Sequence, residues 1–333
     1  MPPRAGRREG LDGQAILGYN PHPSRDFRLD RIEPADHSNL RAGPQEDQEA
    51  PADRTLEPNR RAFMTTASNP DPTSSSTYDN QGQYTRAGIL RYEKVFGHGY
   101  VSTGGHETTK YLCQKLGDSL KPGVRVLDVG SGIGGAMFHL AKAYGAFVTG
   151  VDLAPEMIQL AEERAQELDA PSTVTSILGD VLTQPFAEKF GIVWSRDALM
   201  HLPDKPQLFS HLIGLTEPGG KLVITDYARG TGEGSPEFRA YIASTGYHVV
   251  DPASYGRFLE GAGYVDVQVE DATSRFVGIL EREVAYLDAH RADFLKSFSE
   301  NDLNYLVDRW KMKVRFCQVG DMKWGIYLAT KPA

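Results

Sequence analysis

The chain has 333 residues, a formal net charge of −8 at pH 7 and 40% hydrophobic residues, which suits one or two domains with a sizeable core. The acidic balance, with no basic stripe, argues against nucleic acid as a partner. No apolar run reaches the roughly 18 residues of a membrane span. The two cysteines are too few for a disulfide framework or a metal site and suit a reducing compartment, so we expect a cytoplasmic protein without metal. We also expect a monomer.

The first 80 residues differ from the rest of the chain. They hold half of the 20 prolines but neither lysine nor tryptophan, and they show no apolar periodicity. Such a composition buries too little apolar surface to offset the entropy of ordering, so it predicts a disordered tail over residues 1–80. The tail lacks the apolar core of a signal peptide, and its acids argue against a transit peptide. Met64 is a candidate alternative start. Residues 81–333 are predicted to form one domain.

Strand and helix patterns alternate after residue 105. The pattern predicts helices near 106–117, 134–144, 155–168, 204–216, 236–245, 252–262, 275–292 and 299–315, and strands at 124–129, 147–151, 173–178, 190–195, 220–226, 264–270 and 324–330. Such alternation favours an α/β fold, with a mostly parallel sheet covered by helices on both faces. We expect the last two strands to pair as an antiparallel hairpin. Insertions at about 228–262 and 272–320 are predicted to form a helical cap over the ligand cleft.

A glycine turn follows the first strand. Gly130 and Gly132 come two and four residues after Asp128, and the next strand ends on Asp152, about 20 positions after the glycines. The turn lets a ligand approach the backbone, and an acid at that distance is well placed to accept hydrogen bonds from ribose hydroxyls. The glycines also fit the dinucleotide pattern, which is weak alone. A pyrophosphate disfavours the nearby Asp128, whereas the sulfonium and ammonium of S-adenosylmethionine tolerate it, so the turn favours that cofactor.

Further polar residues follow the third and fourth strands. Asp180 is a candidate for contact with the adenine amino group, or it is a turn aspartate. Asp197 and His201 are four residues apart, which predicts one shared helical face. A carboxylate can hold an amine nitrogen, and a histidine can accept a proton near pH 7, although a lone histidine is often structural. Tyrosines are also frequent around the expected cleft, at positions 84, 92, 100, 227, 241 and 247.

From about residue 83 to its end, the chain resembles the phosphoethanolamine N-methyltransferases, and it is most similar to the C-terminal half of the two-domain plant enzymes. The resemblance is carried by Gln83-Tyr84, by Arg91 to Gly97, by Tyr100 to Gly105, by Ser195-Arg196-Asp197 with His201, by Ile224 to Tyr227 and by Lys323-Trp324-Gly325. It implies a Rossmann-like, seven-stranded methyltransferase sheet. It also implies methyl transfer from S-adenosylmethionine to phosphoethanolamine or its mono- and dimethyl forms, leading to phosphocholine.

The resemblance also implies roles for individual residues. Tyr84 and His201 would close over the substrate and support proton removal, and Asp197 would hold the amine. The cofactor site would comprise Ser102, Asp128, Gly130, Gly132, Asp152, Leu153, Asp180, Val181 and Arg196. The substrate site would comprise Gln83, Tyr84, Tyr92, Asp197, Tyr227, Tyr241, Tyr247 and Lys313, most of them toward the phosphate.

One position departs from the family pattern. The family commonly has an arginine where this chain has Thr245, and an arginine–phosphate pair is a strong polar contact. Three alternatives follow: another basic residue such as Arg239 or Lys311 substitutes, phosphate affinity is reduced, or the acceptor differs. The runner-up function is therefore methyl transfer to another small amine or sulfur acceptor. A nicotinamide oxidoreductase is disfavoured by Asp128, and a non-catalytic scaffold by the retained Asp197 and His201.

Overall fold

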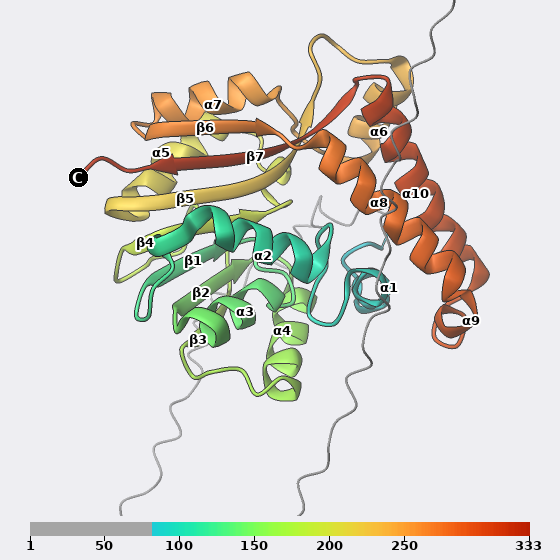
Figure 1. The fold of residues 1–333 in the computed structure, drawn as a ribbon, viewed down its shortest axis with the longest axis horizontal. Coiled ribbons are helices and arrows are strands. Elements are labelled where there is room, and N and C mark those ends of the chain that lie inside the picture. The colour runs from blue at the N-terminus through green and yellow to red at the C-terminus, as the bar shows by residue number, and fades with distance from the viewer. Residues whose placement is uncertain (1–81) are drawn as a thin grey trace, which may run out of the picture. The chain divides into compact units, whose positions relative to one another are not determined.

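The computed structural model describes residues 82–333 of the chain; the predicted tail and Met64 lie outside these residues. The described part contains one seven-stranded sheet with the order β3-β2-β1-β4-β5-β7-β6 (Figure 1). Its strands are β1 (Arg125–Val129), β2 (Phe147–Asp152), β3 (Val174–Leu178), β4 (Phe190–Arg196), β5 (Thr216–Arg229), β6 (Val265–Asp271) and β7 (Met322–Thr330). Strands β1 to β5 pair in parallel, and β7 runs antiparallel to both β5 and β6. The predicted antiparallel pairing of the last two strands is therefore confirmed.

The helices fall close to their predicted positions. They are α1 (Arg86–Phe96), α2 (Gly105–Leu116), α3 (Gly135–Tyr144), α4 (Pro155–Glu167), α5 (Lys205–Leu215), α6 (Pro236–Thr245), α7 (Pro252–Gly261), α8 (Thr273–Ala289), α9 (Arg291–Phe294) and α10 (Glu300–Gln318). Prolines in the first turn and side-chain caps begin several of them. In α10, for example, Ser299 and Asp302 form a reciprocal capping box, which fixes the helix start.

Successive residues of the central strands pack into two separate cores. Val126 of β1 and Trp194 of β4 pack with α2 and α3 on one face of the sheet. Their neighbours Leu127 and Val193 pack with α5 and α7 on the other face. This alternation is the side-chain period of a strand, and continuous apolar strands are expected when a parallel sheet is covered on both faces. The sheet is thus buried on both sides, which leaves its carboxyl edge as the place for a ligand.

Helix α1 is absent from the sequence-based prediction, because its short segment includes Gly88 and lies among other glycines. Thr85 caps its start by accepting a hydrogen bond from the Gly88 amide, and the helix ends at Gly97, where φ is +95°. Nε and Nη2 of Arg164 on α4 donate to the two oxygens of the Glu93 carboxylate on α1, at 2.6 Å each. This buried bidentate pair fixes α1 against α4 and so places the preceding Tyr84 over the sheet edge.

Helices α8 and α10 pack against each other, and α8 also contacts α1 (Figure 1). Glu283 of α8 joins them by accepting hydrogen bonds from the Trp310 indole of α10, at 2.5 Å, and from the Gly104 amide before α2, at 3.0 Å. Helix α7 falls within the insertion 228–262 that was predicted to cap the cleft, but it packs with α5 on a face of the sheet. In residues 82–333 we find no helix with the length and apolar character needed to cross a bilayer.

Candidate functional site

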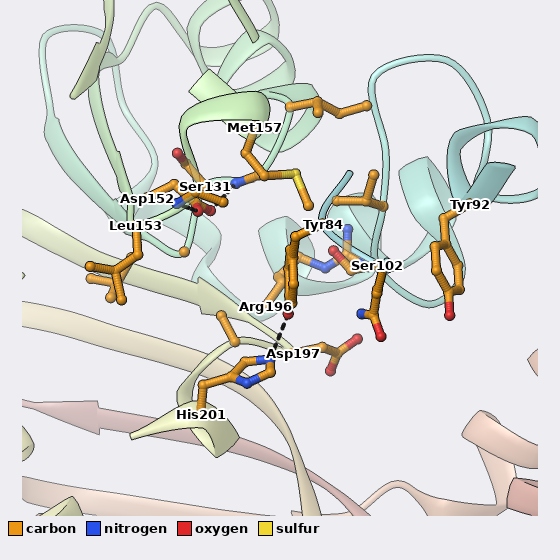
Figure 2. A pocket seen from close by; sticks show the side chains of 18 of the residues that line it. Tyr84, Tyr92, Ser102, Ser131, Asp152, Leu153, Met157, Arg196, Asp197 and His201 are labelled. Carbon is orange, nitrogen blue, oxygen red and sulfur yellow. Dashed lines mark hydrogen bonds between the residues drawn. The ribbon is translucent and has the colours of Figure 1, made fainter. Parts of the chain in front are cut away.

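A cavity of about 530 Å³ lies at the carboxyl ends of β1, β2 and β4. Segments before α2, the turn after β4, and helices α1, α8 and α10 complete its wall. Every predicted site residue lines this cavity except Tyr241. Figure 2 shows Tyr84 reaching His201 with Asp197 beside the contact, while Asp152 and Leu153 lie farther along the wall.

The glycine turn has a backbone conformation that favours glycine. Gly130 has φ of +71° and Gly132 has φ of +55°, a region that other residues rarely adopt. A Cβ atom at Gly130 would lie 2.3 Å from the Ala198 Cβ, so no side chain fits there. The turn therefore presents backbone atoms, and no side chain at Gly130, to the cavity.

Two carboxylates hold the loops around this turn. Asp152 accepts hydrogen bonds from the amides of Gly132, at 2.9 Å, and Ala154, at 3.0 Å, one on each oxygen. Each oxygen retains a lone pair for a ligand hydroxyl. Asp180 accepts from the Leu182 amide at 2.9 Å, so it is both a turn aspartate and a cavity residue.

Asp128 and Arg196 are buried beneath the turn. Burial raises the pKa of Asp128 to about 7, although the Arg196 charge opposes the shift. The Arg196 guanidinium donates to the Thr103 carbonyl at 2.7 Å, the Gly105 carbonyl at 2.9 Å and the Thr109 hydroxyl at 2.7 Å. These hydrogen bonds hold the segment 103–109 in place, so Arg196 fixes the part of the cavity wall that carries Ser102.

The hydroxyl of Tyr84 lies 2.8 Å from Nε2 of His201. Burial raises the pKa of Tyr84 well above its usual value. Burial lowers the pKa of His201 to about 4, with smaller contributions from Lys205 and His248. At neutral pH the hydroxyl is therefore the donor and the neutral imidazole the acceptor. This contact closes the cavity between the segment before α1 and the turn after β4.

Asp197 differs from its predicted conformation. It has φ of +49°, and the 3₁₀ turn Leu199–His201 begins only after it, so the prediction of one shared helical face with His201 is wrong. Both side chains nevertheless line the cavity. Oδ1 of Asp197 accepts from the Thr225 hydroxyl at 2.9 Å and the Trp324 indole at 2.7 Å. Oδ2 is buried and has no partner within residues 82–333, which leaves one carboxylate oxygen for a ligand cation.

The opposite part of the cavity is aromatic and cationic. Tyr227 and Tyr247 line it with their ring centroids 5.9 Å apart, and Lys313 of α10 donates to the Tyr227 hydroxyl at 2.8 Å. The Tyr241 ring lies behind that of Tyr247, at 6.1 Å, and packs on Phe316 because α6 faces α10 there. Tyr241 therefore does not line the cavity, and its predicted ligand contact stays a prediction.

Position 245 and its suggested substitutes lie away from the cavity. Thr245 turns its hydroxyl to carbonyls of its own helix, those of Tyr241 and Ile242. Arg239 and Lys311 are exposed and line none of the cavity. Arg309 lines it instead, one helical turn before Lys313.

Comparisons with known proteins agree with this architecture. A family model described as a methyltransferase domain matches residues 120–262. Phosphoethanolamine N-methyltransferase 1 of Triticum aestivum is 44% identical over 250 residues, which cover 75% of this chain and 49% of the wheat protein. The phosphoethanolamine N-methyltransferase of Plasmodium falciparum is 32% identical over 262 residues, covering 78% of this chain and 97% of the relative. The chain belongs to the phosphoethanolamine N-methyltransferase family.

A solved structure of the family extends the likeness to three dimensions. Phosphoethanolamine N-methyltransferase 2 of Haemonchus contortus, in complex with phosphomonomethylethanolamine and S-adenosylhomocysteine, aligns with a TM-score of 0.74 at 33% identity. The alignment covers 77% of this chain and 59% of the nematode protein. The fold is thus the Rossmann-like, seven-stranded fold of class I methyltransferases. The chain spans about half the length of the plant family members it matches.

Lys205 is a cavity-supporting residue that the sequence analysis missed. It is 2% exposed, and its ammonium donates to the carbonyls of Leu199 at 2.7 Å, Leu202 at 2.7 Å and His248 at 3.1 Å. It therefore fastens both the turn that carries His201 and the segment that carries Tyr247. A lysine beside a proline at a helix start gives no sequence signal for this role, because the three carbonyls come together only in the fold.

Replacing Lys205 should loosen this family member locally. Lys205→Met leaves three buried carbonyls without their donor, so we expect the free energy of unfolding to fall by about 3 kcal/mol. Amide hydrogen exchange should accelerate in residues 198–202 and 246–250 but not in α3. Lys221→Met is the matched control, because Lys221 donates to a single side-chain hydroxyl, that of Thr330 at 2.8 Å, and should change stability by less than about 1 kcal/mol. Equal effects of the two substitutions would contradict the role of Lys205.

Proposed function

We propose that this chain transfers methyl groups from S-adenosylmethionine to the nitrogen of phosphoethanolamine, of its mono- and dimethyl forms, or of both, leading to phosphocholine. The observation that carries the proposal is the Tyr84–His201 hydrogen bond beside the unpartnered Oδ2 of Asp197 within one cavity. A proton acceptor and an ammonium-binding oxygen are the two groups that amine methylation requires. A family member with this reaction in its name, the wheat phosphoethanolamine N-methyltransferase 1, is 44% identical to the chain over 250 residues.

The charge of the cavity near the glycine turn fits S-adenosylmethionine. Asp128, Asp152 and Asp180 line this part, and the nearby Arg196 directs its donors to the protein backbone. A cationic cofactor suits such a wall, whereas a pyrophosphate would meet carboxylates. We propose that the glycine backbone, Asp152, Leu153, Asp180, Val181 and Ser102 hold the cofactor. The chemistry supplied by the bound cofactor is an electrophilic methyl group on a sulfonium.

The acceptor nitrogen must lose a proton before it can attack. An alkylammonium has a pKa of about 10 in water, and only the neutral amine has a lone pair. Oδ2 of Asp197 is placed to accept a hydrogen bond from the ammonium, while Thr225 and Trp324 fix the other oxygen. Asp197 therefore orients the nitrogen and does not act as the base that removes its proton.

Tyr84 and His201 provide a route for the proton. The Tyr84 oxygen accepts a proton from the ammonium as its own proton passes to Nε2 of His201, 2.8 Å away. The neutral state of His201 at pH 7 keeps this nitrogen able to accept. Desolvation lowers the pKa of the bound ammonium as well as that of the imidazolium. The free-energy cost of the proton transfer therefore depends on the difference between these two pKa values. The closed contact also excludes water from the methyl donor.

We also propose a cytoplasmic location for the chain. Cys113 and Cys317 are both buried and unpaired, which supports a reducing compartment. A monomeric state stays a prediction of the sequence analysis.

An acceptor panel tests the proposed function. The full chain is incubated with S-adenosylmethionine and with phosphoethanolamine, its mono- and dimethyl forms, free ethanolamines or glycine, and formation of S-adenosylhomocysteine is measured. We expect turnover of phosphorylated amines and at least about 100-fold lower kcat/KM for the free amines. The free amines lack the phosphate group that the cationic part of the cavity would bind. No turnover of any phosphorylated amine, or preference for glycine, would contradict the proposal.

Substitutions at the two amine-facing groups separate binding from chemistry. His201→Ala should lower kcat by about 100-fold or more, since general-base assistance contributes that much, with little change in S-adenosylmethionine affinity. Asp197→Asn, which keeps the shape but not the charge, should raise KM for the amine and lower kcat together. A His201→Ala variant with unchanged kcat would remove His201 from the mechanism. Calorimetric binding of S-adenosylhomocysteine controls for an intact cofactor site.

A further inference from the structure

Helix α10 presents two cations to the cavity, Arg309 and Lys313, which are one helical turn apart. Within residues 82–333 neither has a carboxylate within 4.0 Å, whereas the outward-facing Arg315 of the same helix pairs with Glu237. The two cations instead donate to tyrosines. Arg309 donates to the Tyr305 hydroxyl at 3.0 Å, and Lys313 to the Tyr227 hydroxyl at 2.8 Å. The wall therefore concentrates positive charge without neutralising it.

This arrangement is electrostatically unfavourable in the absence of an anion. Like charges four residues apart destabilise a helix, and burial increases the cost. Burial, with a smaller contribution from the Arg309 charge, lowers the pKa of Lys313 to about 7, while Asp197, Glu283 and Cys317 act in the opposite direction. A dianionic ligand between the two cations would remove their repulsion and favour the protonated lysine.

The surroundings of Arg309 orient its guanidinium. Its centre lies 5.4 Å from the Tyr305 ring and 5.9 Å from the Tyr241 ring. Aromatic rings beside a planar guanidinium reduce its freedom, and a fixed guanidinium can donate two parallel hydrogen bonds to a phosphate. Tyr241 thus contributes to the site from behind the wall, through Arg309 and Tyr247.

We propose that Arg309 binds the phosphate of the acceptor together with Lys313, and that this pair restricts the acceptor to small phosphomonoesters of amines. The proposal rests on the proposed function and deepens it by naming the residue that selects the phosphorylated acceptor. Asp197 is near enough to Lys313 to influence its charge, so the anion site and the ammonium site are neighbours in one cavity. Neighbouring sites of this kind suit a phosphate and an amine joined by a short linker.

Three variants test the role of Arg309: Arg309→Met, Arg309→Lys and the control Lys311→Met, which alters an exposed cation on the same helix. Arg309→Met should raise KM for phosphoethanolamine by about 10- to 100-fold, the range expected for a lost charge-assisted hydrogen bond, with kcat changed far less. Arg309→Lys should lie between it and the wild type, because a lysine replaces a fork by a point charge. Lys311→Met should stay within twofold.

Binding of inorganic phosphate to the protein saturated with S-adenosylhomocysteine gives a readout independent of turnover. Affinity for the phosphate dianion, whose share of total phosphate at each pH is known, should fall in the wild type between pH 7.0 and 8.5, as Lys313 loses its proton. The fall should be shallower in Arg309→Met, because the pKa of Lys313 rises when the neighbouring cation is removed. The unfolding midpoint of ligand-free Arg309→Met should not be lower than that of the wild type, since the substitution removes a repulsion.

The outcomes separate the two proposals. A wild-type protein that methylates no phosphorylated amine overturns the proposed function. Wild-type turnover of phosphoethanolamine, combined with an Arg309→Met variant whose KM and phosphate affinity match those of Lys311→Met, overturns the role of Arg309 alone. Weaker phosphate binding by Arg309→Met with an unchanged pH profile from pH 7.0 to 8.5 would overturn its coupling to Lys313.

Discussion

The hydrogen bond from Tyr84 to His201 joins groups that are 117 residues apart in sequence, and the closed cavity depends on it. Tyr84 is positioned by α1, which the Glu93–Arg164 pair holds against α4. His201 is positioned by the turn that Lys205 fastens. Neither helix packing nor the turn alone would create the contact. The two supports together bring a hydroxyl and an imidazole over the carboxyl edge of the sheet, where the glycine turn and Asp197 already lie.

Four cations at or behind the cavity wall, Arg196, Lys205, Arg309 and Lys313, differ in their hydrogen-bond partners, and the difference separates support from binding. Arg196 and Lys205 direct their donors mainly to backbone carbonyls, which they hold in place around the cavity. Arg309 and Lys313 face the cavity, and their recorded partners are tyrosine hydroxyls. A cation that is already satisfied by the backbone shapes a wall, whereas one left without an anion is available to a ligand. On this reasoning the cavity has an acidic part for the cofactor and a cationic part for the acceptor.

Much of the sheet and the glycine turn could be predicted from the sequence, because their signals are local. Alternating apolar runs mark the strands, and Gly130 with Asp128 marks the turn. The conformation of Asp197 could not be predicted from its spacing to His201, since its positive φ is imposed by contacts with Thr225 and Trp324 from distant strands. Arg309 was missed for a similar reason: on α10 it resembles its exposed neighbours, and only packing against α6 and α1 turns it toward the cavity. Family resemblance pointed to Tyr84, although the sequence pattern did not predict the helix that positions it.

The proposed proton transfer depends most on His201 being neutral where it meets Tyr84. Burial disfavours the imidazolium, so the pKa of His201 lies near 4, below the value of about 6.5 for an exposed histidine. As pH falls through 6.5, an exposed imidazole gains a proton and His201 does not. Nitrogen-15 NMR of the labelled imidazole, assigned with a His201→Asn variant, measures this directly. We predict a neutral ring with the proton on Nδ1 from pH 8 down to about pH 5. A titration midpoint at pH 6.5 or higher in the ligand-free protein would contradict it.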